Sequence, residues 1–275
     1  MTRRPSRCIF CGSTAKLTEE HIFSHWTHKF LPPRSMTKYR VMGSITYNYR
    51  TDIEILKRSG DVRDWQIKCV CSLRCNNGWM RRIENEARRV VIPLITGQQT
   101  RLSTANQQTL ATWAVLKAMV AEYDMQGHVT THHTQRKRMM NNQTIPDTGW
   151  TVWVGHYVRR RWAISYFAHP FLHLSDKQLA RRSNEKATYF NSNMSTQVIG
   201  QLFIEVIRSP ARDFVDRWRF STPNKGSLYR IWPPSGFSIA WPGRTMTDRD
   251  ADYVATALRD FLGRIVEARG RKPPS

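Results

Sequence analysis

The chain has 275 residues, enough for one large hydrophobic core or two modest ones. It carries 43 Lys and Arg against 21 Asp and Glu, a formal net charge of +22, and 11% of its residues are aromatic. This composition excludes a disordered basic tail and favours a polyanionic partner, with nucleic acid preferred over a membrane surface. No apolar stretch approaches the ~18 residues of a membrane span, and no apolar signal region precedes Cys8, so we expect a cytoplasmic protein without a membrane partner.

All the cysteines lie near the start of the chain. Cys8 and Cys11 form a Cys-x-x-Cys pair, and Cys71 and Cys75 form a second pair whose spacing is one residue longer. Clustered thiols without a secretion signal indicate metal ligands before disulfides, and four thiolates close a tetrahedral structural Zn²⁺ site. Cys69 is an alternative ligand in the second pair. Buried free thiols are the alternative to a metal site altogether.

Between the two cysteine pairs, the sequence predicts a strand, an insertion and a returning strand. The first strand covers Lys16–Phe23, and Trp65–Cys71 alternates and forms the second. Arg34–Asp64 is polar and basic, and we interpret it as a loop with a short strand over Ile53–Leu56. A helix begins near Asn76, because apolar residues then recur at helical spacing: Trp79, Ile83, Ala87 and Val90.

The rest of the chain predicts a core helix and then a sheet. A helix apolar on most sides runs from Thr104 to Tyr123, with Thr104 and Gln107 as a capping box. A polar connection follows over residues 126–148. A last helix begins at Thr247, capped by its own hydroxyl. The predicted strands cover Trp150–Tyr157, Trp162–Phe167, Gln197–Ile207 and Ser227–Trp232.

These elements predict an α+β protein with two domains. Residues 1–97 form a zinc-stapled ββα-metal unit, and residues 98–275 form an α+β scaffold with an antiparallel sheet that grips nucleic acid.

The order Cys-x-x-Cys, Glu20-His21-Ile22, second cysteine pair and Asn76 resembles the zinc-stapled branch of the HNH endonuclease superfamily. The run Cys75-Asn-Asn-Gly-Trp-Met80 is similar to a group of phage and actinobacterial proteins. The resemblance covers roughly the first ninety residues at the level of motifs.

The resemblance implies a catalytic site made of Glu20, His21 and Asn76. In the enzymes it resembles, the histidine deprotonates water, and the residues matching Glu20 and Asn76 hold a divalent ion, Mg²⁺ or Mn²⁺. The family's proline after the histidine is replaced by Ser24. The family's Asn that orients the base is missing before the second cysteine pair, and Asn48 is a distant candidate. Neighbours on a strand face opposite ways, so Glu20 and His21 share one site only at a bulge or a strand end.

Three functions follow as expectations, the third being a structural protein whose charge serves assembly. The first is a metal-dependent endonuclease that hydrolyses phosphodiester bonds, with double-stranded DNA as the expected partner. The alternative is a zinc-dependent nucleic-acid-binding protein without cleavage, such as a phage accessory or regulatory factor.

Overall fold

We describe a computed structural model of the chain. The structure describes residues 5–30, 37–45, 51–59, 61–124, 129–146, 148–159, 165–171, 191–220, 222–234 and 236–257. The chain combines helices with mainly antiparallel strands, so the predicted α+β fold class is confirmed. Within the described ranges, none of the helices combines the length and the apolar character needed to cross a bilayer.

The N-terminal unit consists of two antiparallel strands followed by a helix. Strand β1 (Leu17–His21) pairs with β4 (Gln66–Cys71), from Leu17 opposite Cys71 to His21 opposite Gln66. The wide helical segment η3 (Ser72–Met80) follows, then α1 (Arg81–Ile95). The predicted order of strand, strand and helix is therefore confirmed. The helical region begins earlier than expected, and a break at Gly78 separates η3 from α1.

The insertion between these two strands is a hairpin and not the loop predicted for Arg34–Asp64, but the short strand predicted over Ile53–Leu56 lies within it and is confirmed. Strands β2 (Thr37–Ile45) and β3 (Thr51–Ser59) are antiparallel, and β2 also pairs with β7 (Ser165–Phe171) in parallel at Met42 and Ala168. The partner strand β7 lies in a distant part of the chain, so the local composition of the insertion does not reveal this pairing. Residues 34–36, 46–50 and 60 lie outside the described ranges.

The large sheet contains eight strands in the order β10-β6-β9-β8-β7-β2-β3, with β12 beside β6. A small second pair joins β5 to β11. The bounds of the strands not yet given are β5 (Thr100–Leu102), β6 (Trp150–Tyr157), β8 (Ser192–Ile199), β9 (Leu202–Arg208), β10 (Leu228–Trp232), β11 (Ile239–Trp241) and β12 (Thr245–Met246).

The predicted strand Gln197–Ile207 is two strands, because the chain turns at Gly200. Gly200 has φ 55°, and a Cβ there would lie 2.4 Å from the Ile95 carbonyl oxygen. The next residue, Gln201, donates its backbone N–H to the same oxygen over 3.0 Å. A residue without a side chain therefore lets the β8–β9 turn dock against the end of α1.

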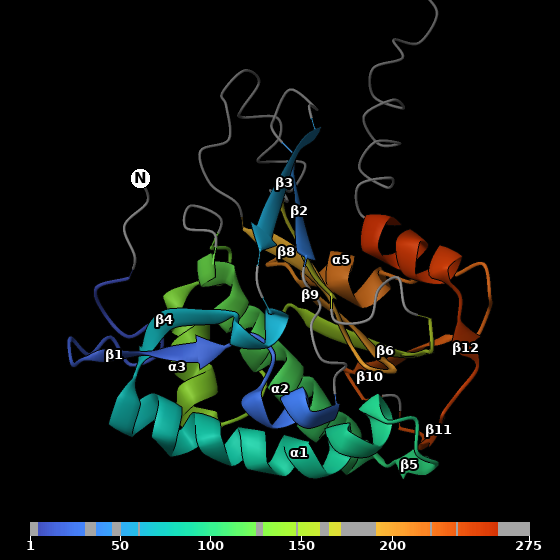
Figure 1. Cartoon of the computed structure of the whole chain (residues 1–275), viewed down its shortest axis with the longest axis horizontal. Helices are drawn as coiled ribbons and strands as arrows, with labels where there is room; N and C mark the ends of the chain where they lie inside the picture. Colours follow the sequence, from blue (N-terminus) through green and yellow to red (C-terminus); the bar gives the residue numbers. More distant parts are fainter. Residues whose placement is uncertain are drawn as a thin grey trace, which may run out of the picture.

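Helix α2 (Thr104–Ala121) is buried on nearly all sides, as predicted. Figure 1 shows it between α1 and the large sheet, and its contacts reach both. Its cap differs from the prediction. Ser103, not Thr104, accepts from the backbone N–H of Asn106, while the buried Gln107 donates to the carbonyl oxygens of Leu102 and Phe237.

A further helix lies in the region predicted as a polar connection. Helix α3 (His133–Asn142) buries Met139 and Met140, so tertiary packing overrides its polar composition. Residues 125–128 and 147 of this region lie outside the described ranges. The cap at Thr247 is confirmed by its hydroxyl, which accepts from the backbone N–H of Asp250. The remaining helical segments are η1 (His25–Phe30), η2 (Val62–Asp64), η4 (Glu122–Asp124), α5 (Arg212–Arg217) and residues 248–257.

One continuous apolar cluster extends from Cys8 to Trp241 and joins the N-terminal unit to the large sheet through α1 and α2. Smaller clusters on the opposite face of the sheet contain residues of the segment 248–257. The predicted division into residues 1–97 and 98–275 stays a prediction.

Candidate zinc cluster and histidine site

Four cysteine sulfurs converge at one end of the β1–β4 pair. The Sγ atoms of Cys8, Cys11, Cys71 and Cys75 all lie within 4.8 Å of one another. Cys8 Sγ is 3.6 Å from Cys75 Sγ, and Cys11 Sγ is 3.5 Å from Cys71 Sγ. Four sulfurs at ~2.3 Å from a zinc ion would be ~3.8 Å apart, so this cluster can bind a metal ion such as Zn²⁺.

Two local turns bring these sulfurs together. In the first pair, Gly12 has φ 73° and donates its backbone N–H to the carbonyl oxygen of Cys8 over 2.9 Å. In the second pair, Cys71 ends β4 and Cys75 lies in the wide turn of η3, which accommodates the extra residue between them. The ring of Phe10 packs edge-on against Trp79 with centroids 4.9 Å apart, which fixes the first turn against η3.

Cys69 is separate from this cluster. It is fully buried in the apolar core, and its carbonyl oxygen accepts from the backbone N–H of Ile9 over 3.1 Å. Burial raises the pKa of the Cys69 thiol well above its usual range, so this group stays a neutral thiol. The geometry therefore favours Cys71 and not Cys69 as a ligand.

His21 lies at the opposite end of β1, as its last residue. Its Nε2 atom is 2.7 Å from the side-chain amide nitrogen of Gln66, the residue that faces it across the strand pair. The rings of His25 and His28 lie 5.7 and 5.4 Å from the His21 ring, and 5.0 Å from each other. His28 Nε2 contacts the Phe23 carbonyl oxygen over 3.0 Å. Three imidazoles, two of them from η1, therefore form one cluster.

The environment of His21 favours its neutral form. Burial, then the nearby charges of His28, Lys117 and His25, lower the pKa of His21 to about 4. Burial also lowers the pKa of His28. A neutral imidazole at pH 7 has a lone pair that can accept a proton.

Glu20 points away from this cluster and into the core. Its side chain pairs with Lys117, a residue of α2 that is 1% exposed, over 2.6 Å. Lys117 Nζ also lies 2.6 Å from Glu84 of α1 and 3.0 Å from the His21 carbonyl oxygen. Burial opposes the charge on Lys117, but the carboxylates of Glu20 and Glu84 outweigh it and raise the pKa of Lys117.

The same buried network includes Ser24, which stands where the resembling family has proline. Ser24 donates to Glu84 Oε1 over 2.9 Å and accepts from Trp113 Nε1 over 3.2 Å. Trp26 Nε1 donates to Glu84 Oε2 over 2.6 Å. These contacts hold η1 against α1 and α2, and so they position the histidine cluster.

The predicted catalytic residues contact different partners. Glu20 binds Lys117, His21 contacts Gln66, and Asn76 donates its side-chain N–H to Thr18 Oγ1 over 3.0 Å and to the Glu19 carbonyl oxygen over 3.3 Å. The β-bulge of β1 lies between Thr18 and Glu19, before the two predicted catalytic neighbours. A carboxylate that is 8% exposed and already paired with an ammonium does not fit an open site for Mg²⁺ or Mn²⁺. That ion stays a prediction.

Sequence reasoning missed the partners of His21. Gln66 could have been found from the strand pairing, since the predicted returning strand starts beside it. His25 and His28 follow His21 at helix-like spacing, which was a weak signal. Lys117 gave no local signal. Asn48, the candidate orienting residue, lies outside the described ranges.

Comparison of the chain with protein-family models, with curated proteins and with solved structures finds no match in any of the three.

Proposed function

We propose that this protein is an HNH-like endonuclease that hydrolyses phosphodiester bonds of DNA, with His21 as the general base. The observation that carries the proposal is the position of His21. It ends a strand anchored by the four-cysteine cluster, and its ring is held by Gln66 from the neighbouring strand.

The proposed reaction begins with a proton transfer from water to His21. Gln66 contacts Nε2, so Nδ1 is the nitrogen left to accept the proton. In this arrangement Nε2 carries a hydrogen and donates it to the side-chain oxygen of Gln66. A rotation of the Gln66 amide by half a turn brings that oxygen into place. The resulting hydroxide attacks phosphorus, and the bond to the leaving oxygen breaks. A divalent ion would neutralise charge on the phosphate in such a reaction. Because Glu20 does not fit as its ligand, no step is assigned to the ion.

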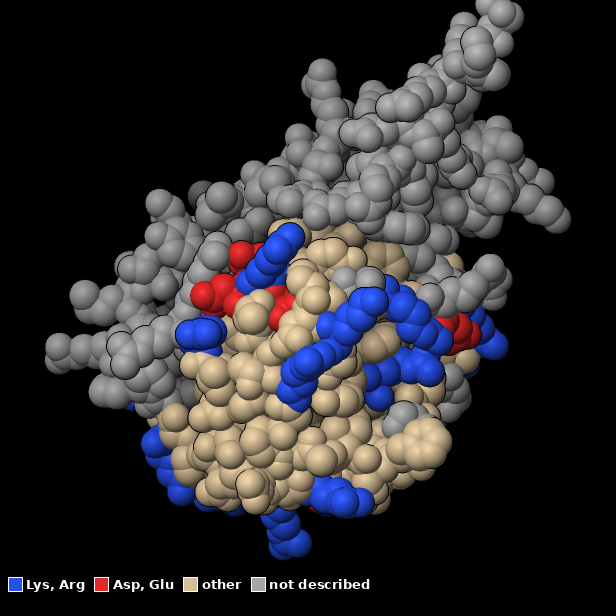
Figure 2. Space-filling model, turned by 90° about the vertical axis from the view of Figure 1, so that its right-hand side faces the viewer, with Lys and Arg blue, Asp and Glu red and all other residues tan. Residues whose placement is uncertain are grey.

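The charge of the protein supports a nucleic-acid substrate. The formal net charge is +22, and Figure 2 shows a face on which Lys and Arg are more prominent than Asp and Glu. Contacts between such side chains and phosphates release counterions and drive binding.

A plasmid-nicking assay with Mg²⁺, with Mn²⁺ and with EDTA tests the proposal. His21→Ala should lower the cleavage rate by about 10² to 10⁴ while zinc content and DNA affinity stay unchanged. His133→Ala is the matched control, because His133 is an exposed histidine of α3. Equal cleavage by wild type and His21→Ala, or cleavage by neither under any metal, would refute the nuclease assignment.

One observation favours a second candidate, a zinc-dependent nucleic-acid-binding protein without catalysis. Lys117 neutralises Glu20, the acid next to His21. This pairing is compatible with a protein that binds no catalytic ion. DNA binding without nicking by the wild-type protein is the result expected for this candidate.

A further inference from the structure

The solvent-facing side of α1 carries two pairs of arginines, Arg81–Arg82 and Arg88–Arg89. All four side chains are exposed. The pairs are seven residues apart, about two helical turns or ~10.5 Å along the axis, so both face the same way. The buried residues of α1 lie on the opposite side: Ile83, Ala87, Val91 and Leu94.

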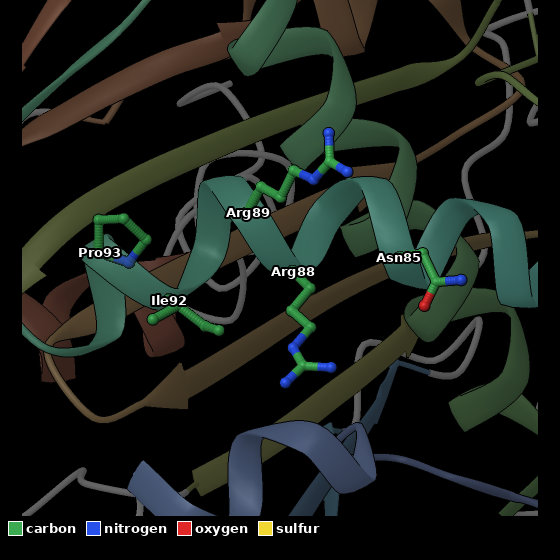
Figure 3. A pocket seen from close by; sticks show the side chains of 5 residues that line it. All are labelled: Asn85, Arg88, Arg89, Ile92 and Pro93. Carbon is green, nitrogen blue, oxygen red and sulfur yellow. The ribbon is translucent and has the colours of Figure 1, made fainter.

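A groove with a volume of ≈ 660 Å³ follows this face of the helix. It is lined by Asn85, Arg88, Arg89, Ile92 and Pro93, which recur at three- and four-residue spacing and so form one wall. Figure 3 shows the side chains of Arg88 and Arg89 extending to opposite sides of α1, with Asn85 on one side of them along the helix and Ile92 on the other. A ligand lying along the helix would therefore have a guanidinium group on each flank.

The two arginines of the groove lack an acidic partner within the part of the chain that the structure describes. Among the residues that the structure describes, no carboxylate forms a salt bridge with Arg88 or Arg89. Glu84, one turn before Arg88, faces inward and pairs with Lys117. Glu86 is the exposed acid of this helix. Guanidinium groups left free in this way match phosphate oxygens with two parallel N–H donors.

Helix α1, which carries the groove, packs against η1. Trp26 of η1, and Ser24 just before η1, donate hydrogen bonds to Glu84, which faces the core one turn before Arg88. His25 and His28 belong to η1 as well. The groove and two of the clustered histidines therefore belong to elements that contact each other.

We propose that this groove binds the phosphodiester backbone of double-stranded DNA, with Arg88 and Arg89 each contacting one phosphate. The choice of DNA rests on the proposed function. The choice of a polyanion rests on the unneutralised charge of the groove.

The test is the salt dependence of binding to a short fluorescein-labelled duplex, measured by anisotropy in EDTA so that no cleavage occurs. The variant is Arg88→Gln/Arg89→Gln. The matched control is Lys137→Gln/Arg138→Gln, which removes the same charge from an adjacent exposed pair on α3. Two lost phosphate contacts should reduce the slope of log K against log salt by about 1.8 and weaken binding on the order of 60-fold near 0.1 M salt. The control should keep the wild-type slope.

A groove variant with the wild-type slope, or a control that loses as much as the groove variant, would overturn the proposal. So would wild-type protein that binds anionic lipid vesicles through Arg88 and Arg89 but not DNA. Circular dichroism and zinc content show that each variant is folded. The test separates this proposal from the proposed nuclease activity. An unchanged slope with intact nicking refutes only DNA binding by the groove. Binding that depends on Arg88 and Arg89, without nicking, refutes only the proposed catalysis.

Discussion

Replacing Lys117 by methionine should strongly destabilise the protein. The Lys117 ammonium is 1% exposed and lies 2.6 Å from both Glu20 and Glu84. Methionine fills a similar volume without a charge, so the substitution removes the ammonium and leaves two buried carboxylates near each other.

The expected loss of unfolding free energy is about 3–5 kcal/mol, because removing one partner of a buried ion pair leaves an uncompensated charge. This is a large part of the roughly 5–15 kcal/mol that stabilises a typical folded protein. Ser24 and Trp26 still donate hydrogen bonds to Glu84 in the variant. Glu20, whose partner is Lys117, should therefore account for much of the loss.

The loss should depend on pH in a definite direction. Burial opposes the charge on Glu84, but Lys117 outweighs it and lowers the pKa of that carboxyl. In the wild type this contribution is present above the ordinary carboxyl pKa and disappears as the pH falls through the lowered value. Without Lys117, burial should dominate, so Glu84 should take up a proton at a higher pH than in the wild type. The difference between variant and wild type should thus be largest near pH 8 and smaller near pH 5.

Urea unfolding at both pH values measures the effect. Lys68→Met is the control, because Lys68 is exposed on β4, and it should change stability by no more than about 0.5 kcal/mol. Lys117→Met/Glu20→Gln should recover part of the loss. A change below about 1 kcal/mol at pH 8, or the same loss at both pH values, would refute the assigned network.

Three other predictions concern the zinc cluster, the sheet and a turn. Cys11→Ser should lose bound zinc and fold poorly, whereas Cys69→Ala should retain one zinc per chain by metal analysis; equal zinc in both would contradict the ligand set. Burial raises the pKa of Glu205, and this effect outweighs the opposite effect of the hydrogen bond from Thr196. The free energy of unfolding of the wild type should therefore fall by up to about 1.4 kcal/mol per pH unit above the ordinary carboxyl pKa. Glu205→Gln should remove this slope in urea unfolding, and an unchanged slope would count against it. Gly200→Ala should lower the free energy of unfolding by about 1–3 kcal/mol, because φ at this residue is positive and the new Cβ would contact a carbonyl oxygen. A thermal midpoint equal to that of the wild type would show that the turn does not require glycine.

Local spacing in the sequence was enough to predict the cysteine cluster and the elements around it. The intervals between Cys8 and Cys11 and between Cys71 and Cys75 limit how these sulfurs can be placed, and the alternation before Cys71 requires a strand. The nearly continuous apolar character of α2 predicted a core helix, and Thr247 marked a helix start. These features depend on neighbours a few residues apart, so they are visible in any short window of the chain.

The arrangement around His21 was decided by contacts that no short window of the sequence contains. Glu20 was expected beside a catalytic ion, but Lys117 from α2 takes its carboxylate, and Gln66 rather than an asparagine contacts His21. The hairpin β2–β3 likewise depends on β7 for its place in the large sheet. Strand pairing and buried ion pairs gain their free energy from partners far away in the sequence. The sequence could therefore determine which residues were available for a site, while only the tertiary structure decided which of them meet.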